Sequence, residues 1–93
     1  MRVGWAASAA ADLDKIVLYI AEDSAKAALA MQERLLEATE DLAQFPQRGR
    51  SGRIADTREL VVAGTPFMAV YKVDPDIVWI LHVVHGAQNW PPT

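Results

Sequence analysis

The sequence predicts a two-layer α+β fold, in which an N-terminal strand and a pair of helices pack on a mainly antiparallel β-sheet. Residues 8–44 carry apolar side chains at helical spacing in two successive stretches, whereas residues 57–84 form three short apolar runs separated by turns. The 93 residues suffice for one hydrophobic core but not for two, so we expect a single domain over residues 1–93.

The N-terminal segment is expected to form a short strand followed by a helix. Val3 and Trp5 alternate with small or polar neighbours, which is typical of a strand. Ser8 is a candidate N-cap for the helix, which should end near Asp23. Four branched apolar side chains at i, i+3, i+4 and i+7 predict its buried face: Leu13, Ile16, Val17 and Ile20.

A second helix is predicted from Ala25 to about Gln44, with Ser24 as its N-cap. Its apolar stripe consists of Ala28, Met31, Leu35, Ala38 and Leu42. Because only a tight turn separates the two helices, they should pack as an antiparallel hairpin. Pro46 ends the second helix, since proline disfavours a helical conformation at the preceding residue.

The rest of the chain predicts an exposed loop and a β-meander. Residues 47–56, QRGRSGRIAD, contain two glycines and no periodicity, which indicates a loop. The runs TRELVV, FMAVYKV and IVWILHVV then alternate with the turns AGTP and DPD. The last run is apolar at nearly every position, so it should lie inside the sheet with both faces covered. Trp5 and Trp79 are expected in the core.

Composition excludes several kinds of site. Without cysteine the chain has no disulfide and no thiolate metal ligand, and without a signal peptide or a long apolar run it is expected to be cytoplasmic. His82 and His85 are the only histidines, and three positions apart on a strand they should face opposite ways. We therefore expect no metal site and favour structural roles for both, with acid–base chemistry at His85 as the alternative.

Four arginines gather between the helices and the meander: Arg48, Arg50, Arg53 and Arg58. Guanidinium groups bind phosphate and carboxylate oxygens alike. A nucleic-acid-binding protein usually has a basic field over a whole face, whereas this chain has a net charge of -3 and a pI of about 5.2. We therefore favour a carboxylate partner over RNA, either nearby acids such as Asp56 and Glu59 or an acidic protein.

Two further apolar features suggest contact with a partner. Leu29 and Leu36 lie off the main stripe of the second helix and are candidates to face another protein. Trp90 lies in the tail beside two prolines, where it either pins the terminus on the core or presents itself to a partner. Pinning is the more common role.

Blocks along almost the whole chain resemble the ParE branch of the RelE/ParE superfamily of toxins from type II toxin-antitoxin systems. They are VGW-x-x-x-A-x-x-DL-x-x-I-x-x-YI, FPQRGRSGR, TRELVVAGTPF, VYKV and ILHVVHGAQNWPP. The resemblance implies a RelE/ParE-like fold and a small bacterial toxin that inhibits DNA gyrase. It also implies neutralisation by a cognate ParD-like antitoxin through an acidic or amphipathic segment, and no small-molecule cofactor.

The sequence departs from the sister RelE branch, which cleaves messenger RNA on the ribosome. Met68 stands where that branch has an arginine, three residues before Tyr71, and Gly86 stands where it tends to have a tyrosine. We therefore expect no catalytic residues and no enzyme activity. A ribosome-dependent endoribonuclease remains the alternative. Because His82 replaces an arginine frequent in the ParE pattern, a non-toxic relative that only binds antitoxin is a further alternative.

The resulting site hypothesis has three parts. The four arginines are candidates for contact with the antitoxin or the target, and Leu29 and Leu36 are candidates for facing the antitoxin. The tail supplies the candidates for the target contact: His85, Gln88, Asn89 and Trp90.

Overall fold

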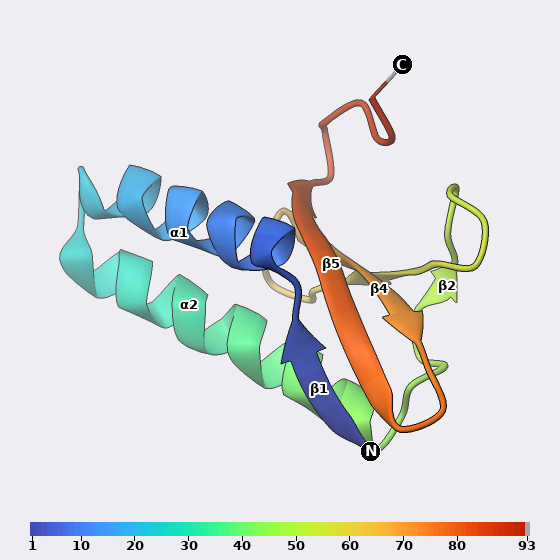
Figure 1. The fold of residues 1–93 in the computed structure, drawn as a ribbon. Helices are drawn as coiled ribbons and strands as arrows, with labels where there is room; N and C mark the ends of the chain where they lie inside the picture. Colours follow the sequence, from blue (N-terminus) through green and yellow to red (C-terminus); the bar gives the residue numbers. More distant parts are fainter. Residues whose placement is uncertain (93) are drawn as a thin grey trace.

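Two helices lie against one face of a five-stranded sheet in the computed structural model, which describes residues 1–92 (Figure 1). The elements are β1 (Arg2–Trp5), α1 (Ala7–Ala21), α2 (Ala25–Glu40), a 3-10 turn (Asp41–Ala43), β2 (Arg50–Ser51), β3 (Arg58–Val61), β4 (Phe67–Val73) and β5 (Ile77–His85). The strand order is β1-β5-β4-β3-β2, with β1 parallel to β5 and the other neighbours antiparallel. The predicted α+β fold class is confirmed.

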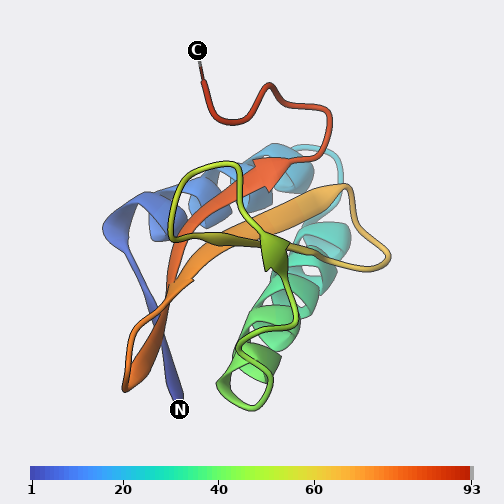
Figure 2. The same cartoon turned by 90° about the vertical axis from the view of Figure 1, so that its right-hand side faces the viewer.

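The sheet lies between the helical layer and the segment around β2, which carries Arg50 and Arg53. Figure 2 shows both helices behind the sheet and the segment around β2 in front of it. The core between helices and sheet consists of Ala9, Leu13, Leu35, Ala38, Leu42, Leu60, Val62, Ala69, Tyr71, Val78, Ile80 and Val83. Both predicted helical stripes contribute to it, so the amphipathic pattern placed the buried faces correctly. Within residues 1–92, neither helix is long and apolar enough to cross a membrane.

The predicted cap of the first helix is wrong. Ala6 occupies the N-cap position and donates its N–H to Ile80 O at 2.9 Å, while Ser8 lies within the first turn. The Ser8 hydroxyl instead donates to Leu81 O at 2.6 Å, and one turn later Asp12 Oδ2 accepts from Val83 N at 3.0 Å. Because β1 pairs only with Ile77–Ile80, these two side chains satisfy the edge of β5 that lies beyond it.

The second helix of the helical hairpin begins where the sequence predicts. Ser24 accepts a hydrogen bond from Ala27 N at 3.1 Å and caps α2. The helix continues to Glu40, and its last predicted turn tightens into the 3-10 turn. Leu35, in the middle of the buried stripe, is fully buried, which contributes about 1.5–3 kcal/mol.

The segment after the hairpin is more ordered than a plain loop. Arg50 and Ser51 form the short strand β2, which pairs with Glu59 and Arg58 of β3. Gly49 precedes it, and a Cβ there would lie 2.7 Å from the ring of Tyr71. This strand is not apparent in the sequence, because two residues are too few to give a periodic signal.

The last strand, β5, lies inside the sheet, as predicted, and its neighbours are β1 and β4. Its two faces are not equally covered, because both helices lie on one side of the sheet (Figure 2). Trp79 is therefore 36% exposed and lies against Gly4 of β1, so its predicted place in the core is wrong. Trp5 is partly buried and packs against the core, as expected.

Candidate functional site

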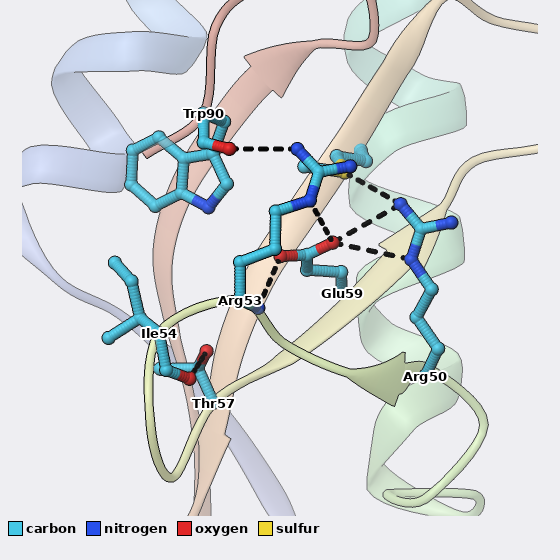
Figure 3. Close-up of polar contacts among 7 residues, drawn as sticks. Arg50, Arg53, Ile54, Thr57, Glu59 and Trp90 are labelled. Carbon is cyan, nitrogen blue, oxygen red and sulfur yellow. Dashed lines mark hydrogen bonds and ion pairs between the residues drawn. The ribbon is translucent and has the colours of Figure 1, made fainter. Parts of the chain in front are cut away.

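Two of the predicted arginines meet at a buried carboxylate. Glu59 of β3 points away from the helices and is 1% exposed at its side chain (Figure 3). Arg50, its partner across the β2–β3 ladder, donates to Glu59 Oε1 from Nη2 at 3.2 Å and from Nε at 3.3 Å. The backbone N–H of Arg53 donates to Oε2 at 2.9 Å, and Arg53 Nε lies 3.9 Å from Oε1. One acid thus orients two of the arginines in residues 48–53, which we call the arginine segment.

Arg53 also binds the C-terminal tail. Its Nη1 donates to the carbonyl oxygen of Trp90 at 2.8 Å (Figure 3). The Trp90 ring is buried in a second apolar cluster, on the face of the sheet away from the helices, with Met68, Val70 and Val84. Of the two interpretations of this tryptophan, pinning the terminus is correct, and its ring is not an exposed anchor for a target. Its Nε1 has no hydrogen-bond partner within residues 1–92.

The other two arginines lie apart from this pair. Arg48 stacks over the ring of Phe45 at 4.6 Å and lies 4.0 Å from an Asp41 carboxylate oxygen. Arg58 donates to Gly49 O at 2.7 Å and more weakly to Gln47 O at 3.4 Å. The four arginines therefore do not form one group: Glu59 orients Arg50 and Arg53, whereas Arg48 and Arg58 are held by other parts of the chain.

Tyr71 holds the backbone on either side of Arg48 through two hydrogen bonds. Its hydroxyl donates to Pro46 O at 2.7 Å and accepts from Gly49 N at 2.8 Å, so both of its hydrogen-bonding roles are used. Burial raises the pKa of the Tyr71 phenol above its usual value near 10.0, and the bond from Gly49 and the charge of Arg58 offset part of that rise. The phenol is therefore protonated at physiological pH, and it links Pro46 to Gly49 through its two hydrogen bonds.

The two histidines face opposite sides of the sheet, as predicted. His82 lies 5.1 Å from the Trp90 ring, and its Nδ1 is 3.1 Å from Asp12 Oδ2 at the strand edge. His85 packs edge-on against Phe67 at 5.5 Å between ring centres. No three His, Asp or Glu side chains are grouped to hold a metal ion anywhere in residues 1–92.

Two of the tail candidates, His85 and Gln88, line a groove that the sequence did not indicate. Two adjoining hollows of about 360 and 310 Å³ share Lys15, Ile16, Phe67 and His85 in their lining. The first extends to Tyr19 and Ile20, and the second to Asp12, Val83 and Gln88. We call these joined hollows the α1 groove. His85 and Gln88 lie in its lining, whereas Asn89 does not and is simply exposed.

Sequence reasoning missed Lys15, Tyr19 and Phe67 as lining residues. The single available signal was Tyr19, an aromatic residue outside the buried stripe of an amphipathic helix. Leu29 and Leu36, predicted on the outer side of α2, are exposed there.

The fold is shared with proteins of toxin-antitoxin systems. The chain is similar to a chain of the chromosomal ParDE TA system from P. aeruginosa, with 28% identity, a TM-score of 0.83, and coverage of 91% of this chain and 95% of the other. The toxin-antitoxin complex RelBE2 from Mycobacterium tuberculosis shares the fold, with a TM-score of 0.64 at 23% identity over 90% and 95% of the two chains.

The family model for the ParE toxin of the type II toxin-antitoxin system parDE matches residues 3–90, and the chain belongs to this family. It is 41% identical to Y4kP of Sinorhizobium fredii (strain NBRC 101917 / NGR234), over 97% of this chain and 93% of that protein. It is 40% identical to Toxin RelE2 of Caulobacter vibrioides (strain ATCC 19089 / CIP 103742 / CB 15), over 94% and 97%. This protein is therefore a toxin of the ParE/RelE superfamily.

Proposed function

We propose that this toxin acts in the cytoplasm by binding DNA gyrase and is held inactive by a ParD-like antitoxin. Two comparisons support the proposal: the family match to a toxin of parDE systems across residues 3–90, and the similarity to the P. aeruginosa ParDE structure. The action proposed is binding, with no chemical step and no cofactor.

The observation that carries this proposal is that Arg50 and Arg53 already make hydrogen bonds within the protein. A site that cleaves a phosphodiester needs cationic groups free to hold the phosphate and a proton donor or acceptor beside it. Arg50 and Arg53 instead bind Glu59 and the tail carbonyl of Trp90. Met68, at the position of the expected arginine, is buried and lies 3.8 Å from Arg50 Nη2.

The same segment retains charge for a protein partner. The side chains of Arg50 and Arg53 remain 56% and 51% exposed although each is oriented by Glu59. Oriented arginines lose less conformational freedom when they bind a carboxylate, which favours recognition of an acidic segment. On the opposite layer, exposed Leu29 and Leu36 supply an apolar surface for the same antitoxin.

The test adds purified toxin to a gyrase supercoiling reaction and, separately, to translating ribosomes. We expect loss of supercoiling, restoration by the antitoxin encoded beside the toxin, and intact messenger RNA. Uninhibited supercoiling at toxin concentrations well above those of gyrase would refute the proposed target.

One relative favours a second candidate function. Toxin RelE2 of Caulobacter vibrioides, at 40% identity over 94% of this chain, carries the name of the ribonuclease branch. If this chain were a ribosome-dependent endoribonuclease, message would be cut in the ribosome arm, and replacing His85 or Arg58 with alanine would stop the cutting. That result would replace the gyrase proposal.

A further inference from the structure

Trp90 is held from two sides by basic side chains, and each of these is anchored by an acid. On one side Arg53 Nη1 donates to Trp90 O at 2.8 Å, while its backbone N–H donates to Glu59 Oε2 at 2.9 Å (Figure 3). On the other side the His82 ring lies 5.1 Å from the Trp90 ring, at a tilt of 54°. Asp12 anchors this histidine, with 3.1 Å between His82 Nδ1 and Asp12 Oδ2. Contacts from β3 and from α1 therefore meet at one residue of the tail.

The contact made by His82 has a defined chemistry. Asp12 Oδ2 also accepts from Val83 N at 3.0 Å, and because a carboxylate can only accept, His82 Nδ1 carries a proton. This hydrogen bond orients the imidazole, whose ring then adds an aromatic contact to Trp90. The His82 side chain is 39% exposed, so its replacement leaves the core between helices and sheet intact.

The ring of Trp90 completes an apolar patch on the sheet face away from the helices. Met68 and Val70 of β4 and Val84 of β5 form this patch, and each is at most 4% exposed. Both helices lie on the opposite face of the sheet (Figure 2). Within residues 1–92, Trp90 is the one buried member of this cluster that comes from outside the sheet. The tail thus supplies part of the cover that a second layer would otherwise provide.

The segment that carries Trp90 has few attachments of its own. Residues 86–89 are exposed, and within residues 1–92 their hydrogen bonds run only to Pro66 and His85, where the tail leaves the sheet. Beyond this root, the hydrogen bond to the described tail is the one from Arg53. Segments with few buried contacts open at a much lower free energy than the core strands do.

We propose that residues 86–90 are a strap with two latches, Arg53 and His82, which closes over the apolar patch and masks it. In the closed state the strap hides Met68, Val70 and Val84 and occupies one N–H of Arg53. In the open state the same face presents an apolar surface beside a freed guanidinium group. This inference goes beyond the proposed function, because it concerns the toxin alone.

The indole proton of Trp90 reports the opening directly. Its Nε1 is buried and has no hydrogen-bond partner within residues 1–92, so exchange of this proton with solvent requires the strap to open. NMR on the full chain measures the exchange rate in the unaltered toxin, in Arg53→Ala, in His82→Ala and in the double variant. Each single substitution should speed exchange by roughly five-fold or more, the factor that corresponds to one lost hydrogen bond or aromatic contact. The double variant should show about the product of the two factors, because both latches act on one closed state.

Uncovering of the patch is measured separately, with a neutral solvatochromic dye, because an anionic dye would also bind the arginines. The dye should bind the double variant and Trp90→Ala, which removes the covering ring and leaves both latches in place. The unaltered chain should not bind it. Arg48→Ala is the matched control and should not bind it either, because Arg48 contacts Phe45 and Asp41 and not the tail. Thermal unfolding verifies that every variant is folded.

Three results would each overturn the two-latch strap. An unchanged exchange rate in His82→Ala would show that the histidine does not hold the tail. A double variant that exchanges no faster than Arg53→Ala would show that the two contacts do not act on the same closed state. If folded Trp90→Ala does not bind the dye, the tail does not mask the patch. Neither gyrase nor antitoxin is present in these measurements, so the proposed function stands or fails independently of them.

Discussion

Arg53 Nη1 donates a 2.8 Å hydrogen bond to the carbonyl oxygen of Trp90, joining residues 37 positions apart in the sequence. The same arginine donates its backbone N–H to Glu59, so a single residue connects the buried acid to the tail (Figure 3). The C-terminal segment is consequently held over the sheet face that carries Met68, Val70 and Val84. This connection makes the arginine segment and the tail one structural unit.

Replacing Arg53 with alanine should release the tail. The loss of the bond to Trp90 O removes its polar tether, while the apolar cluster still holds the ring. We expect faster amide exchange in residues 86–90 with little change in β4 and β5, measured by hydrogen–deuterium exchange. Lys72→Ala is the matched control, because its ion pair in the described part of the chain is with Asp74, at a turn. Unchanged exchange in the tail of the Arg53 variant would show that the tether is unimportant.

Replacing Glu59 with alanine should lower the free energy of unfolding by about 1–3 kcal/mol, because its hydrogen-bond donors lose their acceptor. The estimate is below that for a fully buried pair, since both arginine side chains are about half exposed. Urea unfolding measures the change, with exposed Glu33→Ala as control. Equal stability of the two variants would contradict a structural role for Glu59.

Replacing Gly49 with alanine should destabilise the protein by about 1–3 kcal/mol through overpacking. The new Cβ would lie 2.7 Å from the Tyr71 ring and 2.9 Å from Glu59 O, distances that force one of them to move. Thermal unfolding measures the loss. Gly86→Ala serves as the comparison, since its Cβ would meet only Pro66 O, at 3.3 Å; a larger loss there would contradict the packing argument.

Stability should decline in alkaline solution because of Tyr71. Folding raises the pKa of its phenol, mainly through burial, so the native state holds the proton more tightly than the unfolded state. The contribution is complete below the ordinary pKa near 10.0 and is lost as pH rises through the higher folded value. Urea unfolding between neutral pH and pH about 11 measures this decline, which Tyr71→Phe should reduce and Tyr19→Phe should leave in place.

Binding of the antitoxin should weaken as salt concentration rises, because the exposed arginine side chains attract an acidic segment. Replacing Arg48, Arg50 and Arg53 together with alanine should lower the affinity and flatten the salt dependence, measured by titration calorimetry. Arg48→Ala alone is the cleaner variant, since Arg48 does not contact Glu59. An affinity of the unaltered chain that does not change from low to high salt would refute the electrostatic contact.

The sequence by itself determined the two helices, the meander and the layer in which each apolar stripe is buried. These features are local, since a helical stripe and a strand run are read from neighbouring residues. Ser24 was recognisable as a cap for the same reason: its partner, Ala27 N, is three residues away. The ParE pattern likewise depended on blocks present in the printed sequence.

Only the tertiary structure decided the long-range hydrogen-bond partners of the polar side chains. Ser8 looked like a cap but binds Leu81, because the short β1 leaves an edge of β5 open. The β2–β3 register brought Arg50 to Glu59, and packing of α1 beside β5 assembled the α1 groove from Lys15 and His85. Such pairings depend on chain segments many residues apart, and the free energy that selects them comes from packing the core as a whole.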